Sequence, residues 1–200
     1  GSEMCIRDSD ANRIISGGNE TFAHDPNGNI ISRTGDIPVT YSYNPDNMLT
    51  SVNNGGIVTN YLYDIFGNRR QADRNGIITR YVLNINGSMS NVMMETDGNN
   101  NPKNYYVYGL GLVSRIKPDG TIHYYHSDER GSIVAMTDQF QNVTHKYSYG
   151  AYGELLQSEE QDSNPFRYVG GYGVMDEGNG LYFMRARYYD PKLGRFMSED

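Results

Sequence analysis

Tyr61-Leu62-Tyr63-Asp64-Ile65-Phe66-Gly67 decides the fold of this chain, because its spacing of a ring, an acidic or amide residue and a glycine recurs about every twenty residues. The central position of this Tyr-x-x-Asp/Asn-x-x-Gly motif falls at residues 25, 44, 64, 84, 109, 128 and 150. An aromatic residue stands three places before the central position in every copy. A repeat this short indicates an array of stacked units rather than a single-site enzyme domain.

Each period also contains a second turn near its middle. In the unit that begins at Asp64 this turn is Asn75-Gly76, a pair that tolerates the positive φ angles of a type I′ hairpin. Comparable turn residues occur in other units at Gly35, Asn54-Gly55, Asp97-Gly98 and Asp119-Gly120. Two short strands joined by two turns in about twenty residues predict a continuous antiparallel meander.

The recurring residues have an expected structural role. In residues 57–63 the alternation places Ile57, Thr59, Tyr61 and Tyr63 on one face, so successive repeat tyrosines form a column across the sheet. The Asp or Asn side chain is expected to accept hydrogen bonds from turn amides, and the glycine to supply a left-handed backbone. The residues assigned to this structural motif are Tyr61, Asp64, Gly67, Tyr81, Gly87, Tyr125, Asp128, Gly131, Tyr147 and Gly153.

Composition supports an ordered, nearly all-β chain. Apolar residues make up 37% of the sequence and the mean hydropathy is -0.67, but only 20% of residues are charged. The polar excess comes largely from glycine, asparagine and serine, and it accompanies 18 tyrosines. Disordered chains are poor in aromatic residues, whereas tyrosine and tight-turn residues suit strands. Only residues 154–160 are compatible with a short helix.

Charge and residue usage exclude several function classes. A net charge of -7 without a basic patch argues against a nucleic-acid partner. No apolar run is long enough to span a membrane. Cys5 has no second cysteine to pair with, and no Cys/His spacing resembles a metal site. We therefore expect no metal, no cofactor and no membrane span.

The sequence resembles the Rhs/YD-repeat proteins, and the similarity is most specific in its last third. Residues 125–132 resemble the start of the Rhs repeat-associated core, and residues 147–154 resemble a later segment of it, with Gly150 in the place of an aspartate. Residues 185–191 and 194–196 close the match. The closing residues expected to be structural are Arg187, Tyr188, Tyr189, Asp190, Pro191, Gly194 and Arg195.

The resemblance also implies a division of the chain. Residues 1–10 share nothing with the repeat and are interpreted as a non-native or disordered tail. Residues 11–120 are assigned to YD repeats. Residues 121–200 are assigned to the Rhs repeat-associated core, truncated at its C-terminus.

Members of this family wind the repeat sheet into a hollow shell. The resemblance therefore implies a structural, encapsulating module of a secreted or cell-surface bacterial toxin. Its expected partners are its own upstream repeats and a C-terminal toxin domain that the shell holds. The alternative is a module that binds carbohydrate or another cell surface through exposed tyrosine rings. Encapsulation requires most of the repeat tyrosines to be buried, whereas carbohydrate binding requires several of their rings to be exposed.

The resemblance implies self-cleavage by a pair of aspartates as well. Asp176 and Asp200 best match the two positions, although the segment around Asp176 departs from the family motif. Two adjacent carboxylates would share a proton, so that one acts as an acid while the other activates water. The alternative is that Asp176 caps a glycine-rich turn and that Asp200 is merely terminal. We expect no enzymatic activity from this segment alone.

Other polar residues are expected to be structural. Arg167 and Arg185, like the arginines of the closing motif, are expected to stack on tyrosines and pair with acidic turns. His123, His126 and His145 lie on strand-like segments without metal-ligand regularity.

Overall fold

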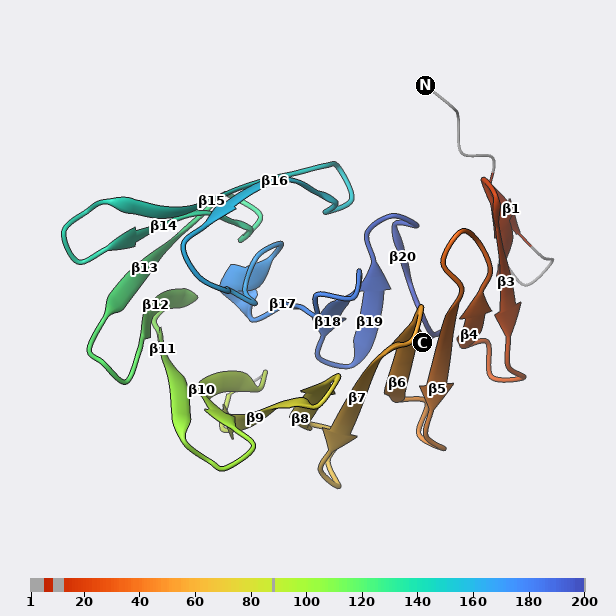
Figure 1. Ribbon diagram of the computed structural model, residues 1–200, viewed down its shortest axis with the longest axis horizontal. Coiled ribbons are helices and arrows are strands. Elements are labelled where there is room, and N and C mark those ends of the chain that lie inside the picture. The colour runs from red at the N-terminus through yellow and green to blue at the C-terminus, as the bar shows by residue number, and fades with distance from the viewer. Residues whose placement is uncertain (1–5, 9–12, 88, 200) are drawn as a thin grey trace.

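The computed structural model describes residues 6–8, 13–87 and 89–199. Within them sixteen strands follow one another in chain order in one antiparallel sheet, which we call the wall. Four short strands form a second sheet that lies inside the curve of the wall (Figure 1). The wall strands are β1 (Ile6–Asp8), β2 (Ile14–Gly17), β3 (Glu20–His24), β4 (Ile30–Arg33), β5 (Val39–Tyr43), β6 (Leu49–Asn54), β7 (Ile57–Tyr63), β8 (Arg69–Arg74), β9 (Ile77–Asn84), β10 (Asn91–Asp97), β11 (Pro102–Tyr108), β12 (Leu112–Ile116), β13 (Ile122–Ser127), β14 (Ile133–Asp138), β15 (Val143–Tyr149) and β16 (Leu155–Glu160).

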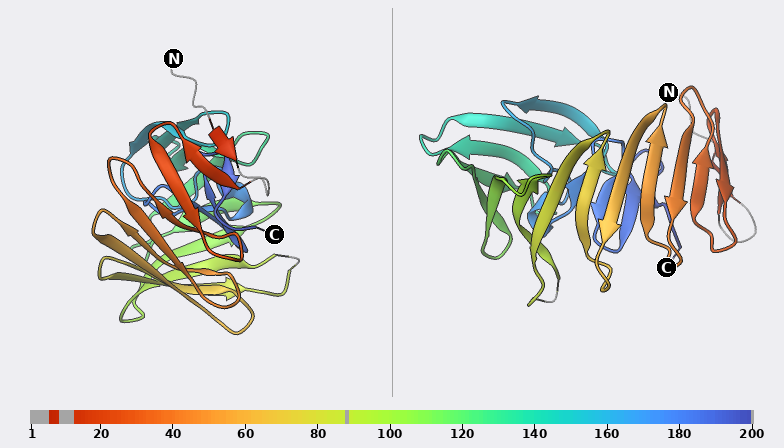
Figure 2. Two further views of the ribbon diagram at one scale, coloured as in Figure 1. Left: turned by 90° about the vertical axis from the view of Figure 1, so that its right-hand side faces the viewer. Right: turned by 60° about the horizontal axis from the view of Figure 1, so that its bottom comes forward.

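Residues 161–199, which we call the inner segment, fill the concave side of the wall. They contain the 3-10 helix η1 (Gly170–Tyr172) and the four strands of the second sheet. These strands are β17 (Met175–Asp176), β18 (Tyr182–Met184), β19 (Arg187–Asp190) and β20 (Arg195–Phe196). Figure 2 shows the wall strands side by side, with the inner segment enclosed behind them.

The repeat motif builds the turn at one end of each hairpin. At Asp64 the side-chain Oδ1 accepts hydrogen bonds from the amides of Phe66 (3.0 Å) and Asn68 (2.9 Å). The amide of Gly67 donates to the Asp64 carbonyl (3.0 Å), with Gly67 at φ 80°. One carboxylate thus satisfies two turn amides, and glycine makes the left-handed conformation inexpensive.

The same strands are bent where they enter these turns. In six motif copies the pairing with the next strand skips one residue just before the turn. The skip falls between the residues that stand two places and one place before the central position of the motif. These shifts lie at Ala23/His24, Ser42/Tyr43, Leu62/Tyr63, Val107/Tyr108, His126/Ser127 and Ser148/Tyr149. A bulge bends its strand and increases the local twist. Its regular recurrence gives the wall a steady curvature.

The ring column faces the concave side. None of the seven repeat rings exposes more than 8% of its surface. They meet side chains of the inner segment: Tyr61 lies 5.0 Å from Tyr188 between ring centroids, and Tyr106 lies 4.9 Å from Phe166. One hydrophobic core therefore joins the wall to the inner segment.

The expected all-β meander is confirmed, but the short helix expected over 154–160 is wrong. Residues 155–160 form β16, which pairs with β15 through five partners from Tyr149↔Leu155 to His145↔Glu160. Strand pairing satisfies the backbone groups that a helix would otherwise satisfy. A helix over these residues would bury no apolar face that could offset the loss of strand pairing, because most of β16 is exposed.

The division of the chain differs in detail from the sequence interpretation. Within the first ten residues, Ile6–Asp8 form β1 and pair with β2, and the other seven lie outside the described residues. The wall continues through residue 120, because β12 pairs with β13. The change of architecture comes after β16, and the boundaries at 10 and 120 stay predictions.

Candidate functional site

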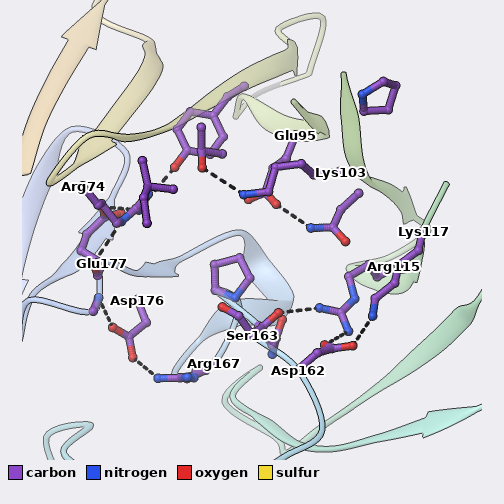
Figure 3. Close-up of a pocket in the computed structure, with 18 of the residues that line it drawn as sticks. Arg74, Glu95, Lys103, Arg115, Lys117, Asp162, Ser163, Arg167, Asp176 and Glu177 are labelled. Atoms are coloured by element: carbon purple, nitrogen blue, oxygen red, sulfur yellow. Dashed lines mark hydrogen bonds and ion pairs between the residues drawn. The ribbon is translucent and has the colours of Figure 1, made fainter. Parts of the chain in front are cut away.

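A cavity with a volume of about 560 Å³ lies between the wall strands β8–β12 and the inner segment. Its charged and polar lining is shown in Figure 3. The labelled residues are Arg74, Glu95, Lys103, Arg115, Lys117, Asp162, Ser163, Arg167, Asp176 and Glu177.

Asp176, the first predicted catalytic aspartate, lines this cavity from β17. Its Oδ2 accepts a hydrogen bond from Arg167 at 2.7 Å, and its Oδ1 accepts one from the Gly178 amide at 2.8 Å. Arg167 also binds both carboxylate oxygens of Glu160 at 2.8 Å. The carboxylate of Asp176 is thus engaged by a cation and a turn amide, which matches the turn-capping alternative.

Asp200, the second predicted aspartate, lies outside the described residues. Its neighbour Glu199 forms an ion pair with Arg13 at 2.7 Å, near β2. Asp176 lies on β17 and residue 199 follows β20, and these are the two edges of the four-stranded sheet. Three strand spacings separate those edges by roughly 14 Å. The pairing of the two aspartates stays a prediction.

A buried charge cluster that the sequence interpretation missed lies beside Asp176. The Glu177 carboxylate is fully buried and forms ion pairs with Arg69 and, at 2.8 Å, with Arg74. The Arg69 guanidinium also lies 3.8 Å from the centroid of the Phe183 ring and donates to the Tyr188 hydroxyl at 3.2 Å. Burial acts against the charge of Arg69, but Glu177 together with the surrounding tyrosines outweighs it and raises the arginine pKa. This cluster fixes the inner segment to β8.

A second charge cluster joins the start of the inner segment to the wall. Arg115 and Lys117 both bind the carboxylate of Asp162. Burial alone would raise the pKa of Asp162, but the hydrogen bonds and positive charges of Lys117 and Arg115 outweigh it and lower the pKa to about 2. His145 Nε2 lies 3.3 Å from the same carboxylate.

The predicted repeat residues occupy recurring positions in the wall. Asp128 repeats the turn of Asp64, with its Oδ1 accepting from the amides of Arg130 (2.9 Å) and Ser132 (2.8 Å). Of the four glycines predicted for the repeat motif, Gly67, Gly131 and Gly153 have a left-handed φ. Gly87 does not adopt this conformation.

Several repeat tyrosines also hydrogen-bond to the inner segment. Tyr61 accepts from Asn179 (3.0 Å), and Tyr125 donates to Asn164 (3.1 Å). Tyr147 instead donates to Glu160 at the end of β16 (2.6 Å). Tyr81 contacts the buried guanidinium of Arg69, with 4.9 Å to its ring centroid.

Burial keeps these tyrosines neutral. It raises the pKa of Tyr41 and Tyr63 to about 12, and it raises those of Tyr61, Tyr106 and Tyr125 well above the usual value. The phenols therefore act as hydrogen-bonding groups and not as acid–base groups near neutral pH.

In the closing motif, the two tyrosines of β19 face different surroundings. Tyr188 is buried against Tyr61 and Phe183, whereas the Tyr189 hydroxyl donates to the carbonyl of Tyr152 at 3.0 Å. Arg187 lies over the Phe196 ring with 3.8 Å to its centroid.

The remaining residues of the closing motif form a turn. Asp190 is buried and accepts from the Lys192 amide at 2.8 Å, and its burial raises its pKa. Pro191 follows it, and Gly194 completes the turn with φ 63°. Arg195 pairs with Asp8 at 2.8 Å and so links the second sheet to β1.

The described residues contain neither a metal-binding cluster nor a membrane-spanning helix. No group of three or more His, Cys, Asp or Glu side chains is arranged to hold a metal ion. No helix in this part of the chain has the length and apolar content required to cross a membrane.

Comparison with known proteins gives consistent matches. A family model described as the teneurin YD-shell matches residues 6–200. The tRNA nuclease WapA of Bacillus subtilis is 36% identical over 196 residues, a region covering 94% of this chain and 8% of that protein. The double-stranded DNA deaminase toxin A of Burkholderia cenocepacia is 28% identical over 94 residues, covering 44% of this chain and 6% of that protein.

Among solved structures, the crystal structure of TcdB2-TccC3 has a TM-score of 0.58 at 14% sequence identity. The alignment covers 90% of this chain and 12% of that chain. At this identity the likeness is one of fold alone. The chain spans less than a tenth of the length of the curated toxins that it matches.

Proposed function

This chain belongs to the teneurin YD-shell family, and we propose that it forms a segment of a hollow β shell that encloses a C-terminal polypeptide of a secreted bacterial toxin. The observation that carries the proposal is the concave face of the wall. Its ring column is buried, and residues 161–199 of the same chain occupy it. A wall that already holds its own C-terminal stretch on this face is suited to hold the polypeptide that follows.

The named activities of the relatives support a structural role. One relative is a tRNA nuclease and another is a DNA deaminase toxin, and both match this segment over a small share of their length. Two different chemistries require different catalytic groups. A segment common to both is therefore better suited to a shared task, such as enclosing and delivering the toxic part.

The position of the rings favours encapsulation over carbohydrate binding. Sugar binding through the repeat would require several rings exposed in one plane. All seven repeat rings are instead buried against the core. Binding of glycans by other exposed side chains of the full protein stays a prediction.

Encapsulation is tested by protease protection in the full-length protein. The C-terminal polypeptide should resist protease at concentrations that digest the same polypeptide supplied separately. Tyr125→Asp, which places a charge in the buried column, should abolish the protection. Tyr124→Asp is the matched control, because Tyr124 is the preceding residue of β13 and is exposed. Equal digestion of the attached and the separate polypeptide would contradict encapsulation.

Self-cleavage by Asp176 and Asp200 is a separate proposal with its own test. Asp176→Asn in the full-length protein should prevent release of the C-terminal polypeptide on a denaturing gel, and Asp138→Asn, at the end of β14, should not. A cleavage pattern unchanged by Asp176→Asn would remove Asp176 from the reaction and leave encapsulation untouched.

A further inference from the structure

The last wall strand is followed by residues 161–165, which we call the strap. The strap crosses from β16 to the concave side and is held to β12 by two contacts. Arg115 donates to the carbonyl of Ser163 at 2.7 Å, and the Asp162 carboxylate binds Arg115 together with Lys117. The side chain of Arg115 is only 1% exposed, so these bonds lie in a region from which water is largely excluded.

Two buried histidines lie under the strap. His123 on β13 and His145 on β15 are buried, and their rings meet edge to face with 5.5 Å between centroids. His145 Nε2 lies 2.9 Å from the carbonyl oxygen of Asp162, and its Nδ1 lies 2.8 Å from the Thr144 hydroxyl. A carbonyl oxygen can only accept, so Nε2 of His145 carries the hydrogen and donates it to the strap.

The partner of His123 requires this ring to be neutral. Its Nδ1 lies 3.3 Å from a terminal nitrogen of Arg115. A guanidinium has donors and no acceptor, so Nδ1 of His123 must be the acceptor of this bond. A proton on Nδ1 would make it a second hydrogen-bond donor facing the donor of Arg115. It would also place a second positive charge beside the arginine that holds the strap.

The other charges around the pair do not remove this conflict. His123 faces Arg115 from β12, Lys117 after β12, His145 from β15 and Asp162 from the strap, and it pairs in register with Asp138 of β14. His145 faces Asp162 and pairs in register with Glu160 of β16. Asp162 is the carboxylate nearest to the pair, and Arg115 and Lys117 already bind it.

We propose that His123, supported by His145, is an acid-sensitive clasp that holds the strap on the wall at neutral pH and loosens it in mildly acidic solution. Loosening would open the cavity, because Asp162, Ser163, Asn164 and Pro165 form part of its lining. It would also affect β17, because the amide of Asp176 donates to the carbonyl of Pro165 at 2.7 Å. All contacts of the clasp lie within this chain, so it does not depend on what the shell encloses.

The sign of the pH effect follows from the neutral state of His123. Burial and then the charge of Arg115 lower the pKa of His123 in the docked form. In the released form water reaches the ring and its pKa rises toward the ordinary value of about 6.5, while Arg115 stays opposite His123 in the sheet. Docking is therefore strongest above about pH 6.5 and weakens as the pH falls below it, because only the released form takes up the proton readily. One proton changes the opening equilibrium by at most about tenfold per pH unit.

Hydrogen exchange in the full-length protein between pH 7.5 and 5 tests the clasp. The informative amides are those of Gln161, which donates to Thr144, and of Ile133, which donates to Arg167. After correction for the intrinsic chemical rate, their exchange should accelerate up to about tenfold per pH unit below pH 6.5. The amide of Asp64, in a turn far along the wall, should show no such acceleration.

His123→Gln keeps an oxygen that can accept from Arg115 but removes the titration, so it should abolish the acceleration. His126→Gln is the matched control, because His126 lies on the same strand and is exposed. The pKa of His123 itself, measured from deuterium exchange at its ring Cε1 by mass spectrometry, should lie below 6.5. The proposal is overturned if the acceleration survives His123→Gln, or if the ring titrates at or above 6.5 in the folded protein.

Discussion

Arg69 occupies a position of the repeat at which four of the six other copies carry an aliphatic residue. It follows the central position of its motif by five residues, as do Ile30, Leu49, Ile133 and Leu155. A charge at a position that most copies fill with an aliphatic residue indicates a buried partner, and the structure provides it in Glu177. This departure from the repeat is the one sequence signal that could have located the cluster.

Arg69→Met should destabilise the chain by about 3 kcal/mol, because it leaves the fully buried Glu177 with one partner fewer. Adding Glu177→Gln should recover part of that loss, since the uncompensated buried charge is removed. The control Arg70→Met changes an exposed neighbour and should alter the free energy of unfolding by less than about 0.5 kcal/mol. Urea denaturation measures all three, and equal costs for the two arginine variants would contradict a buried pair.

The turn glycines differ in what surrounds them. Gly67 and Gly131 have nearly the same left-handed φ, 80° and 81°. A Cβ on Gly67 would meet only the Met48 sulfur at 3.4 Å, whereas a Cβ on Gly131 would overlap the ring of Tyr172. The backbone requirement is shared by both turns, and the steric requirement belongs to the turn beside the inner segment.

Gly67→Ala should therefore cost about 1–2 kcal/mol from backbone strain alone. Gly131→Ala should cost at least about 1 kcal/mol more, because overpacking is added to the same strain. The two values come from parallel chemical denaturation curves. Equal destabilisation would show that Tyr172 is not held against the turn at Gly131.

At the scale of elements, the motif supplies curvature as well as turns. Each of six hairpins shifts register where its strand enters the turn of the repeat motif, so bending is distributed along the wall rather than placed at one hinge. The inner segment then contacts the wall differently through the two faces of β19. Tyr188 packs in the core against Tyr61 of β7, whereas Tyr189, the next residue, donates to the exposed β15–β16 turn at Tyr152.

Tyr188→Phe and Tyr189→Phe compare these two faces of β19 directly. The Tyr188 hydroxyl is buried and lies 3.0 Å from that of Tyr63 and 3.2 Å from an Arg69 nitrogen. Its loss should cost about 1–3 kcal/mol, since buried groups lose a partner. Loss of the Tyr189 hydroxyl, whose bond to Tyr152 is exposed, should cost less than about 1 kcal/mol. Thermal unfolding measures both, and a larger loss for Tyr189→Phe would contradict the assignment of the two faces.

At the scale of the whole molecule, the wall depends on the inner segment for cover. The seven repeat rings lie on a face that only residues 161–199 close within the described chain. A sheet with an uncovered aromatic face and open edges is prone to self-association.

Deletion of residues 161–199 should therefore convert the chain from a compact species into aggregates. Light scattering after size exclusion would detect the change, and binding of a hydrophobic dye would report the exposed rings. Deletion of an exposed turn such as Asn75-Gly76, with a two-residue replacement, is the control and should leave the species compact. A truncated wall that stays compact and binds no dye would show that the inner segment is not required for its solubility.

The candidate site was predictable only in part. The sequence singled out Asp176, but its partner Arg167 and the adjoining Glu177–Arg69 cluster come from segments separated by 9 and 108 residues. Glu177 has no local pattern that distinguishes it from a solvated acid. The strand β16 was missed for a related reason, because its polar residues show neither helical nor clear strand periodicity and its pairing with β15 decides its state.

The sequence by itself determined the all-β meander and its strand order, because turn chemistry and alternation act between residues only a few positions apart. The tertiary structure alone decided that the wall closes around residues 161–199 and that buried charges join the two. Those contacts form between segments up to 187 residues apart, and their energies depend on burial that no local pattern encodes.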